Sequence, residues 1–156
     1  MTAVHLIRHA KAKNRLEWSD RDELRPLTKR GRREANALAE RLASEELVRL
    51  VSSPYVRCVQ TLEPLAVAVD LPIETTELLA EDADGNAAVY LLLSLFGTAT
   101  VACCTHGDVL FDVLGIVADG GVHLDGPQDA PVASAWILEV EAGRFAGARF
   151  VKQPPR

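Results

Sequence analysis

The stretch Val4-His5-Leu6-Ile7-Arg8-His9 decides the fold class of this chain. A short apolar run with β-branched residues, such as its first four positions, is typical of a buried strand near the middle of a sheet. Arg8 and His9 follow directly, where this strand ends. Because ligands of open α/β sheets bind at the carboxyl ends of the strands, the stretch predicts both a central strand and the place of a site.

Helical and strand patterns alternate along the rest of the chain. The expected helices cover residues 29–45, 54–69, 86–96 and 107–118, and the expected strands cover 47–52 and 98–105, with 73–78 as a short strand or extended loop and 133–141 and 144–151 as a closing hairpin. Ser53 is expected to cap the second helix, with Pro54 at its first position. This alternation predicts a three-layer α/β/α fold with a mostly parallel central sheet, helices on both faces and an antiparallel C-terminal hairpin. We expect residues 1–156 to form a single domain.

Composition excludes several classes of protein. The 156 residues are 48% hydrophobic and 25% charged, which is typical of a soluble globular protein. Apolar runs fall far short of the eighteen or so residues of a membrane span, and the N-terminus does not resemble a secretory signal, so we expect a cytoplasmic protein with no membrane partner. The three cysteines are expected to be reduced. A metal site built from Cys103, Cys104 and His106 is rejected, because successive strand side chains point to opposite faces.

Positive charge is concentrated near the N-terminus. Residues 1–33 carry 10 of the 17 basic residues and 4 acidic ones, although the whole chain has a net charge of −5. Such a local field suits a small anionic ligand better than a nucleic acid polymer, which would need a broad basic face with aromatic residues. Residues 10–26 show little pattern, and a long loop of this kind is often a substrate lid. The side chains that it could bring over a site are Lys11, Lys13, Arg15, Trp18 and Arg25.

Two strands deliver similar residues to the same edge of the sheet. The first ends in Arg8-His9 and the late apolar strand ends in Thr105-His106-Gly107, where glycine allows the backbone to approach a ligand closely. Arg57 lies near the start of a helix that follows another strand, where free N–H groups favour an anion. Strict alternation would place Arg8 and His9 on opposite faces, so the chain must leave extended geometry there.

No glycine-rich phosphate loop, dinucleotide fingerprint or serine nucleophile elbow is present, so phosphate recognition must rely on side chains. The other two histidines, His5 and His123, are expected to be structural or exposed. A protein in which the histidines at the sheet edge are incidental to metabolite binding remains an alternative.

Four segments in order carry a resemblance to a known family. They are Leu6-Ile7-Arg8-His9-Ala10, residues 25–31, residues 52–61 and Thr105-His106-Gly107. This set resembles the histidine phosphatase superfamily, also called the phosphoglycerate mutase-like or RHG family. Within it, the chain looks most like the SixA-type phosphohistidine phosphatases and the phosphatase half attached to some Nudix hydrolases. Ala10 departs from the glycine of the family signature, and residues 11–15 do not match the mutases, which disfavours mutase activity.

The resemblance implies a metal-independent phosphatase that needs no cofactor. His9 would be the nucleophile, and Arg8, Arg57 and a protonated His106 would complete the phosphate pocket beside Gly107. Glu81 would transfer the proton, with Asp82, Asp84 and solvent as alternatives.

The expected substrate is a phosphohistidine in a protein. The alternatives are a nucleotide or another small phosphate ester and, for a protein without catalysis, phosphate binding alone. The sequence leaves the oligomeric state open.

Overall fold

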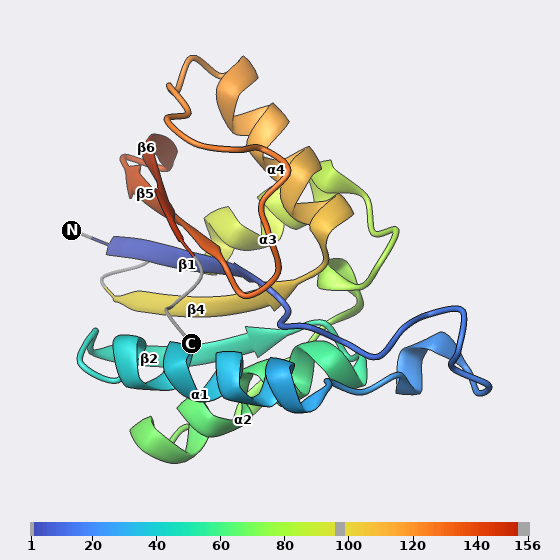
Figure 1. Ribbon diagram of the computed structural model, residues 1–156. Coiled ribbons are helices and arrows are strands. Elements are labelled where there is room, and N and C mark those ends of the chain that lie inside the picture. The colour runs from blue at the N-terminus through green and yellow to red at the C-terminus, as the bar shows by residue number, and fades with distance from the viewer. Residues whose placement is uncertain (1, 96–98, 153–156) are drawn as a thin grey trace.

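The described residues, 2–95 and 99–152 of this computed structural model, contain a six-stranded sheet (Figure 1). The strands are β1 (Thr2–Arg8), β2 (Leu47–Ser52), β3 (Ile73–Thr75), β4 (Thr100–Thr105), β5 (Ala135–Glu141) and β6 (Arg144–Val151). Their order across the sheet is β3-β2-β4-β1-β5-β6. The pairs β3-β2, β2-β4 and β4-β1 are parallel, whereas β5 is antiparallel to both β1 and β6. The predicted mostly parallel sheet with an antiparallel hairpin is confirmed.

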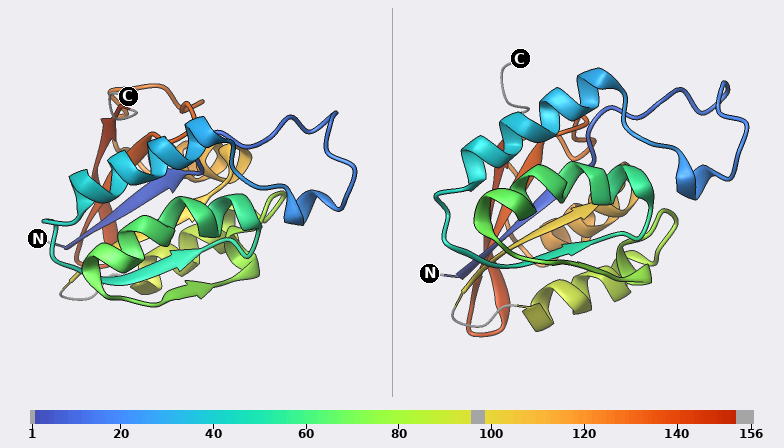
Figure 2. Two further views of the ribbon diagram at one scale, coloured as in Figure 1. Left: turned by 60° about the horizontal axis from the view of Figure 1, so that its bottom comes forward. Right: turned by 90° about the horizontal axis from the view of Figure 1, so that it is seen from below.

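Helices cover both faces of this sheet. They are α1 (Lys29–Leu42), α2 (Val56–Val69), α3 (Gly85–Leu95) and α4 (Gly107–Asp119), with short 3-10 helices at Asp22–Leu24 and Glu77–Leu79. The helices α1 and α2 lie on one face, and α3 and α4 lie on the other (Figures 1 and 2). Within the part of the chain that the structure describes, no helix is long and apolar enough to cross a membrane.

The burial of β1 explains its apolar sequence. Val4 and Leu6 are fully buried with the side chains of α3 and α4, whereas Ile7 is fully buried with those of α1 and α2. The neighbouring β4 follows the same alternation, with Val101 on the first side and Ala102 on the second. A strand with a helix layer on each face has no polar face, which is why both strands are almost continuously apolar.

Several predicted boundaries differ from the observed ones. The second helix begins at Val56, and no side chain among the described residues caps its N-terminus, so the expectation that Ser53 is the cap and Pro54 the first helical residue is wrong. Ser53 instead lies in the connection after β2, where its hydroxyl contacts His106. The first helix ends at Leu42, three residues before the expected end at position 45. The expected positions of Phe96 and Thr98 lie outside the described residues.

The parallel strands β1, β2, β3 and β4 all end at one edge of the sheet. Their register pairs Arg8 of β1 with Thr105 of β4, and Ser52 of β2 with Cys104 of β4. The helices α2 and α4 begin just beyond this edge, and the loop that follows β1 extends past it (Figure 1). The topology therefore brings residues from about positions 8, 53 and 106 together.

Candidate active site

Arg8 is the last residue of β1, and its guanidinium packs against Gly107. Its Nη1 donates to the Ala130 carbonyl at 2.5 Å, while its Nε is buried without a hydrogen-bond partner in the described part of the chain. A Cβ at position 107 would lie 2.8 Å from the Arg8 Cζ, which is closer than two carbons can approach without a clash. Gly107 therefore makes room for Arg8, a reason that the sequence did not indicate.

His9 lies one residue past the end of β1, with its backbone N–H donating to the Thr105 carbonyl at 3.1 Å. Its Nδ1 lies 2.8 Å from the Ala10 carbonyl oxygen. Because a carbonyl can only accept, Nδ1 carries the hydrogen and Nε2 keeps a free lone pair. Burial, together with the charges of Arg57 and Arg8, lowers the pKa of His9 to about 4. The ring is therefore neutral at pH 7, the form that a nitrogen nucleophile needs.

His106 follows β4 and is almost fully buried, with 1% of its surface exposed. Its Nε2 lies 2.9 Å from the Ser53 Oγ and 3.5 Å from the Cys58 Sγ, while its Nδ1 is buried without a partner in the described residues. The centroids of the His9 and His106 rings are 5.4 Å apart. Burial and the neighbouring His9 and Arg57 lower the pKa of His106 to about 2, so the ring is neutral here. The protonated ring remains a prediction for the phosphate-bound enzyme.

Arg57, in the first turn of α2, is completely buried and held by Asp22. Its Nη1 donates to the Asp22 carbonyl at 2.8 Å, and its Nη2 donates to the Asp22 carboxylate at 2.9 Å. Its Nε has no partner within residues 2–95 and 99–152. Asp22 thus fixes the two terminal nitrogens of the guanidinium and leaves the Nε free.

Asp22 was not identified from the sequence, because its contact with Arg57 joins a loop to a helix 35 residues away. It also accepts a hydrogen bond from Arg25 Nε at 2.8 Å. Burial disfavours the ionised carboxylate, but the hydrogen bonds from Arg25 and Arg57 outweigh this effect and lower the pKa of Asp22 to about 2. Asp22 is therefore ionised and ties the loop to the buried arginine.

The three candidate proton donors occupy different places. Glu81 lines the pocket beside His9 and forms ion pairs with Arg15 at 2.8 Å and Arg57 at 3.4 Å. Asp82 also lines the pocket. Asp84 is absent from the pocket lining, and its carboxylate accepts the Asn86 N–H at 3.1 Å at the start of α3. The structure thus brings Glu81 and Asp82 to the site and leaves Asp84 outside it.

The base of the loop over residues 10–26 is well anchored. An isolated antiparallel bridge pairs Ala12 with Leu27, and the Lys13 N–H donates to the Pro26 carbonyl at 3.0 Å. Arg25 Nη1 donates to the Lys13 carbonyl at 2.6 Å. Trp18 does not line the pocket, and its indole donates to the Arg21 carbonyl at 3.0 Å.

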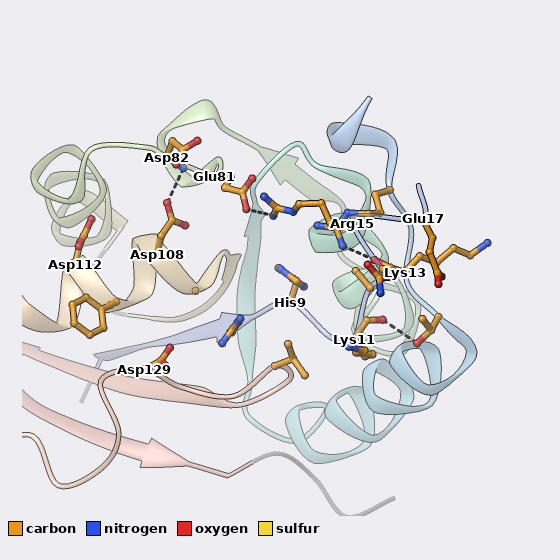
Figure 3. Close-up of a pocket in the computed structure, with 18 residues that line it drawn as sticks. His9, Lys11, Lys13, Arg15, Glu17, Glu81, Asp82, Asp108, Asp112 and Asp129 are labelled. Atoms are coloured by element: carbon orange, nitrogen blue, oxygen red, sulfur yellow. Dashed lines mark hydrogen bonds and ion pairs between the residues drawn. The ribbon is translucent and has the colours of Figure 1, made fainter. Parts of the chain in front are cut away.

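These elements surround a pocket of about 1040 Å³. Arg8, His9 and Gly107 line it at the edge of the sheet, while Arg57 and His106 lie buried next to it. Figure 3 shows basic residues on one side of His9 and aspartates on the other. The basic side holds Lys11, Lys13 and Arg15, and the acidic side holds Asp82, Asp108, Asp112 and Asp129.

His5 and His123 lie outside the pocket lining. No group of three His, Cys, Asp or Glu side chains among the described residues could hold a metal ion.

Residues 4–89 match the histidine phosphatase superfamily (branch 1). The chain belongs to this superfamily. It is 32% identical over 155 residues to an 8-oxo-(d)GTP phosphatase of Mycolicibacterium smegmatis (strain ATCC 700084 / mc(2)155), a match that covers 97% of this chain and 48% of that relative. The chain thus spans about half the length of the curated relative it matches. The predicted family and the predicted class of enzyme, phosphatase, are confirmed at the level of the superfamily.

Several solved structures are similar in fold, and two of them are SixA proteins. The protein histidine phosphatase SixA complexed with tungstate has a TM-score of 0.76 and 24% identity, with 97% of this chain and 96% of that chain covered. The putative phosphohistidine phosphatase SixA from Agrobacterium tumefaciens has a TM-score of 0.68 and 24% identity, with 88% and 91% covered. At this level of identity the two structures establish the fold alone.

Proposed function

We propose that this chain is a phosphatase in which His9 attacks phosphorus and carries the phosphoryl group as a phosphohistidine. One observation supports this most directly. Three nitrogens of the site, Arg8 Nε, Arg57 Nε and His106 Nδ1, are buried without a partner in the described residues. Buried polar groups without partners are rare and costly, and they require an explanation. Phosphate oxygens beside His9 would accept hydrogen bonds from the two guanidinium nitrogens, and from His106 Nδ1 once that nitrogen carries a hydrogen.

The proposed reaction has two displacements at phosphorus. The Nε2 lone pair of His9 forms a bond to phosphorus as the bond to the leaving group breaks, and the leaving group takes the electron pair. Water then attacks phosphorus, the P–N bond breaks, and its electron pair returns to Nε2. Arg8, Arg57 and His106 would stabilise charge on the phosphate oxygens in both steps, a role that needs no metal ion.

Glu81 is the expected proton donor to the leaving group and lies in the pocket, but its ion pairs with Arg15 and Arg57 involve the carboxylate form. In this arrangement Glu81 is better suited to accept a proton from the attacking water than to donate one. Substrates with a good leaving group would depend less on a proton donor. For substrates with a poor leaving group, Asp82 or solvent would donate the proton.

Protein phosphohistidine is our first substrate candidate. The likeness in fold to the protein histidine phosphatase SixA supports it, and so does a broad pocket of about 1040 Å³. The P–N bond of such a substrate is labile, in keeping with a site where Glu81 is held in ion pairs. We also propose that residues 1–156 form one histidine phosphatase domain.

A nucleotide is the second candidate. The relative named 8-oxo-(d)GTP phosphatase supports it, as do the three basic side chains that line the pocket beside the nucleophile, Lys11, Lys13 and Arg15. A substrate with several anionic groups would find additional positive charge there.

The deciding experiment is turnover in the presence of a chelator. The wild type, His9→Ala and the control His123→Ala, an exposed histidine outside the pocket, receive p-nitrophenyl phosphate, a phosphohistidine protein and a panel of nucleotides. We expect turnover and an acid-labile phosphoenzyme in the wild type and the control, and neither in His9→Ala. A folded wild type that binds phosphate without turnover would instead be a binding module.

A further inference from the structure

We propose that Lys11 and Lys13 form a second anion subsite, which selects substrates carrying another phosphate directly beyond the one transferred to His9. Such a subsite would favour the second substrate candidate over the first, in the form of a phosphoanhydride such as a nucleoside diphosphate or triphosphate. This inference rests on the proposed function of His9 and extends it to substrate choice.

The first observation is the position of the two lysines along the chain that follows the nucleophile. His9, Lys11 and Lys13 all line the pocket together with the small Ala12, whereas Ala10 is fully buried, with 0% of its surface exposed. In an extended segment, residues two apart lie on the same side, about 7 Å from one another. The two lysines therefore follow the nucleophile on the basic side of the pocket, opposite the aspartates (Figure 3).

The second observation is that this segment is held in place. The Lys11 N–H donates to Glu34 Oε1 at 2.9 Å, and the Lys11 carbonyl accepts the Thr28 N–H at 2.9 Å. The bridge between Ala12 and Leu27 and the hydrogen bonds of Lys13 described above complete the anchoring. The two lysines thus start from a fixed backbone, which reduces the ordering cost of binding an anion.

The third observation is that the charges of the two lysines are not neutralised. Within the described residues, neither forms an ion pair within 4.0 Å, whereas Arg15 pairs with Glu81 and Arg25 pairs with Asp22. The Lys13 ammonium lies 5.9 Å from the centroid of the Trp18 ring, a contact that does not neutralise its charge. A flexible four-carbon stem allows each ammonium to turn toward an anion in the pocket.

Leaving-group chemistry agrees with this assignment. When His9 Nε2 bonds to the terminal phosphorus of a nucleoside diphosphate, the bond from that phosphorus to the bridging oxygen breaks. The nucleoside monophosphate leaves with the electron pair on that oxygen. Positive charge from Lys11 and Lys13 would stabilise this developing phosphate, so that Glu81 need not supply a proton.

The test compares one substrate that has a second phosphate with one that lacks it. GDP and p-nitrophenyl phosphate are given to the wild type, Lys11→Ala, Lys13→Ala and the double variant. Lys29→Ala is the matched control, because it removes the same charge from an exposed position outside the pocket. Calorimetry of pyrophosphate and inorganic phosphate binding gives a readout that does not need turnover.

We expect each lysine variant to lower kcat/KM for GDP about 10-fold, which corresponds to about 1.4 kcal/mol. The double variant should lose more, while p-nitrophenyl phosphate turnover should change less than about 3-fold and Lys29→Ala should affect neither substrate. Pyrophosphate binding should weaken in parallel, and phosphate binding should not.

Equal effects on both substrates, or unchanged GDP turnover, would overturn the inference. A wild type that hydrolyses p-nitrophenyl phosphate but not GDP would also overturn it, as would lysine variants impaired only on a phosphohistidine protein. Failure of the proposed phosphatase function would give another result: the wild type would turn over no substrate and form no phosphoenzyme. Pyrophosphate binding would then test the subsite alone.

Discussion

Replacing Gly107 by alanine should reduce catalysis through Arg8. The added Cβ would lie 2.8 Å from the Arg8 Cζ and 3.0 Å from its Nε. Because carbon atoms in contact are about 3.5 Å apart or more, the guanidinium must shift by roughly 0.7 Å. It cannot move freely, since its Nη1 is bound to the Ala130 carbonyl at 2.5 Å. A displacement of about 1 Å in an active site can reduce the rate about 100-fold, so we expect Gly107→Ala to lower kcat/KM roughly 10- to 100-fold.

The assay is kcat/KM on p-nitrophenyl phosphate together with the inhibition constant of vanadate, with urea unfolding to verify the fold. Gly120→Ala is a matched control at the end of the same helix, because its Cβ would make only an ordinary contact, 3.4 Å from the Val117 carbonyl oxygen. This control should keep nearly full activity. A folded Gly107→Ala protein whose activity stays within twofold of the wild type would refute the role of Arg8 packing.

Two further predictions concern stability. The folded-state pKa values of His9, about 4, and His106, about 2, lie below the ordinary value of 6.5. The unfolded chain therefore binds protons first as the pH falls below about 6.5, and each histidine should lower the free energy of unfolding by roughly 2 kcal/mol at pH 5 relative to pH 8. Urea unfolding at both pH values should show about half of this combined loss in His106→Asn, and an unchanged loss would contradict the burial argument. Asp22→Ala should destabilise the fold by roughly 2 kcal/mol because it removes the partner of the buried Arg57, whereas the exposed Glu23→Ala should change little. Equal unfolding midpoints in urea for these two variants would argue against that ion pair.

The strands of the sheet could be predicted from the sequence, because a strand that is buried on both faces is almost continuously apolar. The strand at residues 47–52 was placed with its observed bounds, and the helix layers on both faces follow from the alternation of elements. The start of the second helix was misplaced because Ser53 followed by Pro54 has the local pattern of a helix start. The hydroxyl of Ser53 lies 2.9 Å from His106, a residue 53 positions away, and no local rule contains that contact.

The same difference between local sequence patterns and contacts of distant residues applies to the site. Arg8, His9 and His106 could be selected because each directly follows or ends a strand, and strand ends are recognisable in sequence. Asp22 could not, because its role depends on how a patternless loop folds back onto α2. Glu81 was expected in the site and lies there, but its ion pair with Arg15 depends on the same loop and was not foreseen.

The unpartnered nitrogens of the site link its function to its stability. A buried donor or acceptor without a partner costs about 1–3 kcal/mol, so Arg8, Arg57 and His106 together make this region of the fold less stable than fully paired groups would. A phosphate dianion would satisfy all three at once and, by binding only the folded chain, would shift the folding equilibrium toward it. The same dianion would favour the protonated form of His106, a ring that burial keeps neutral in this structure. The positive charge that His106 contributes to stabilising the transition state would then form only when the substrate binds. His9, whose tautomer is fixed by the Ala10 carbonyl, would keep the lone pair that attacks phosphorus.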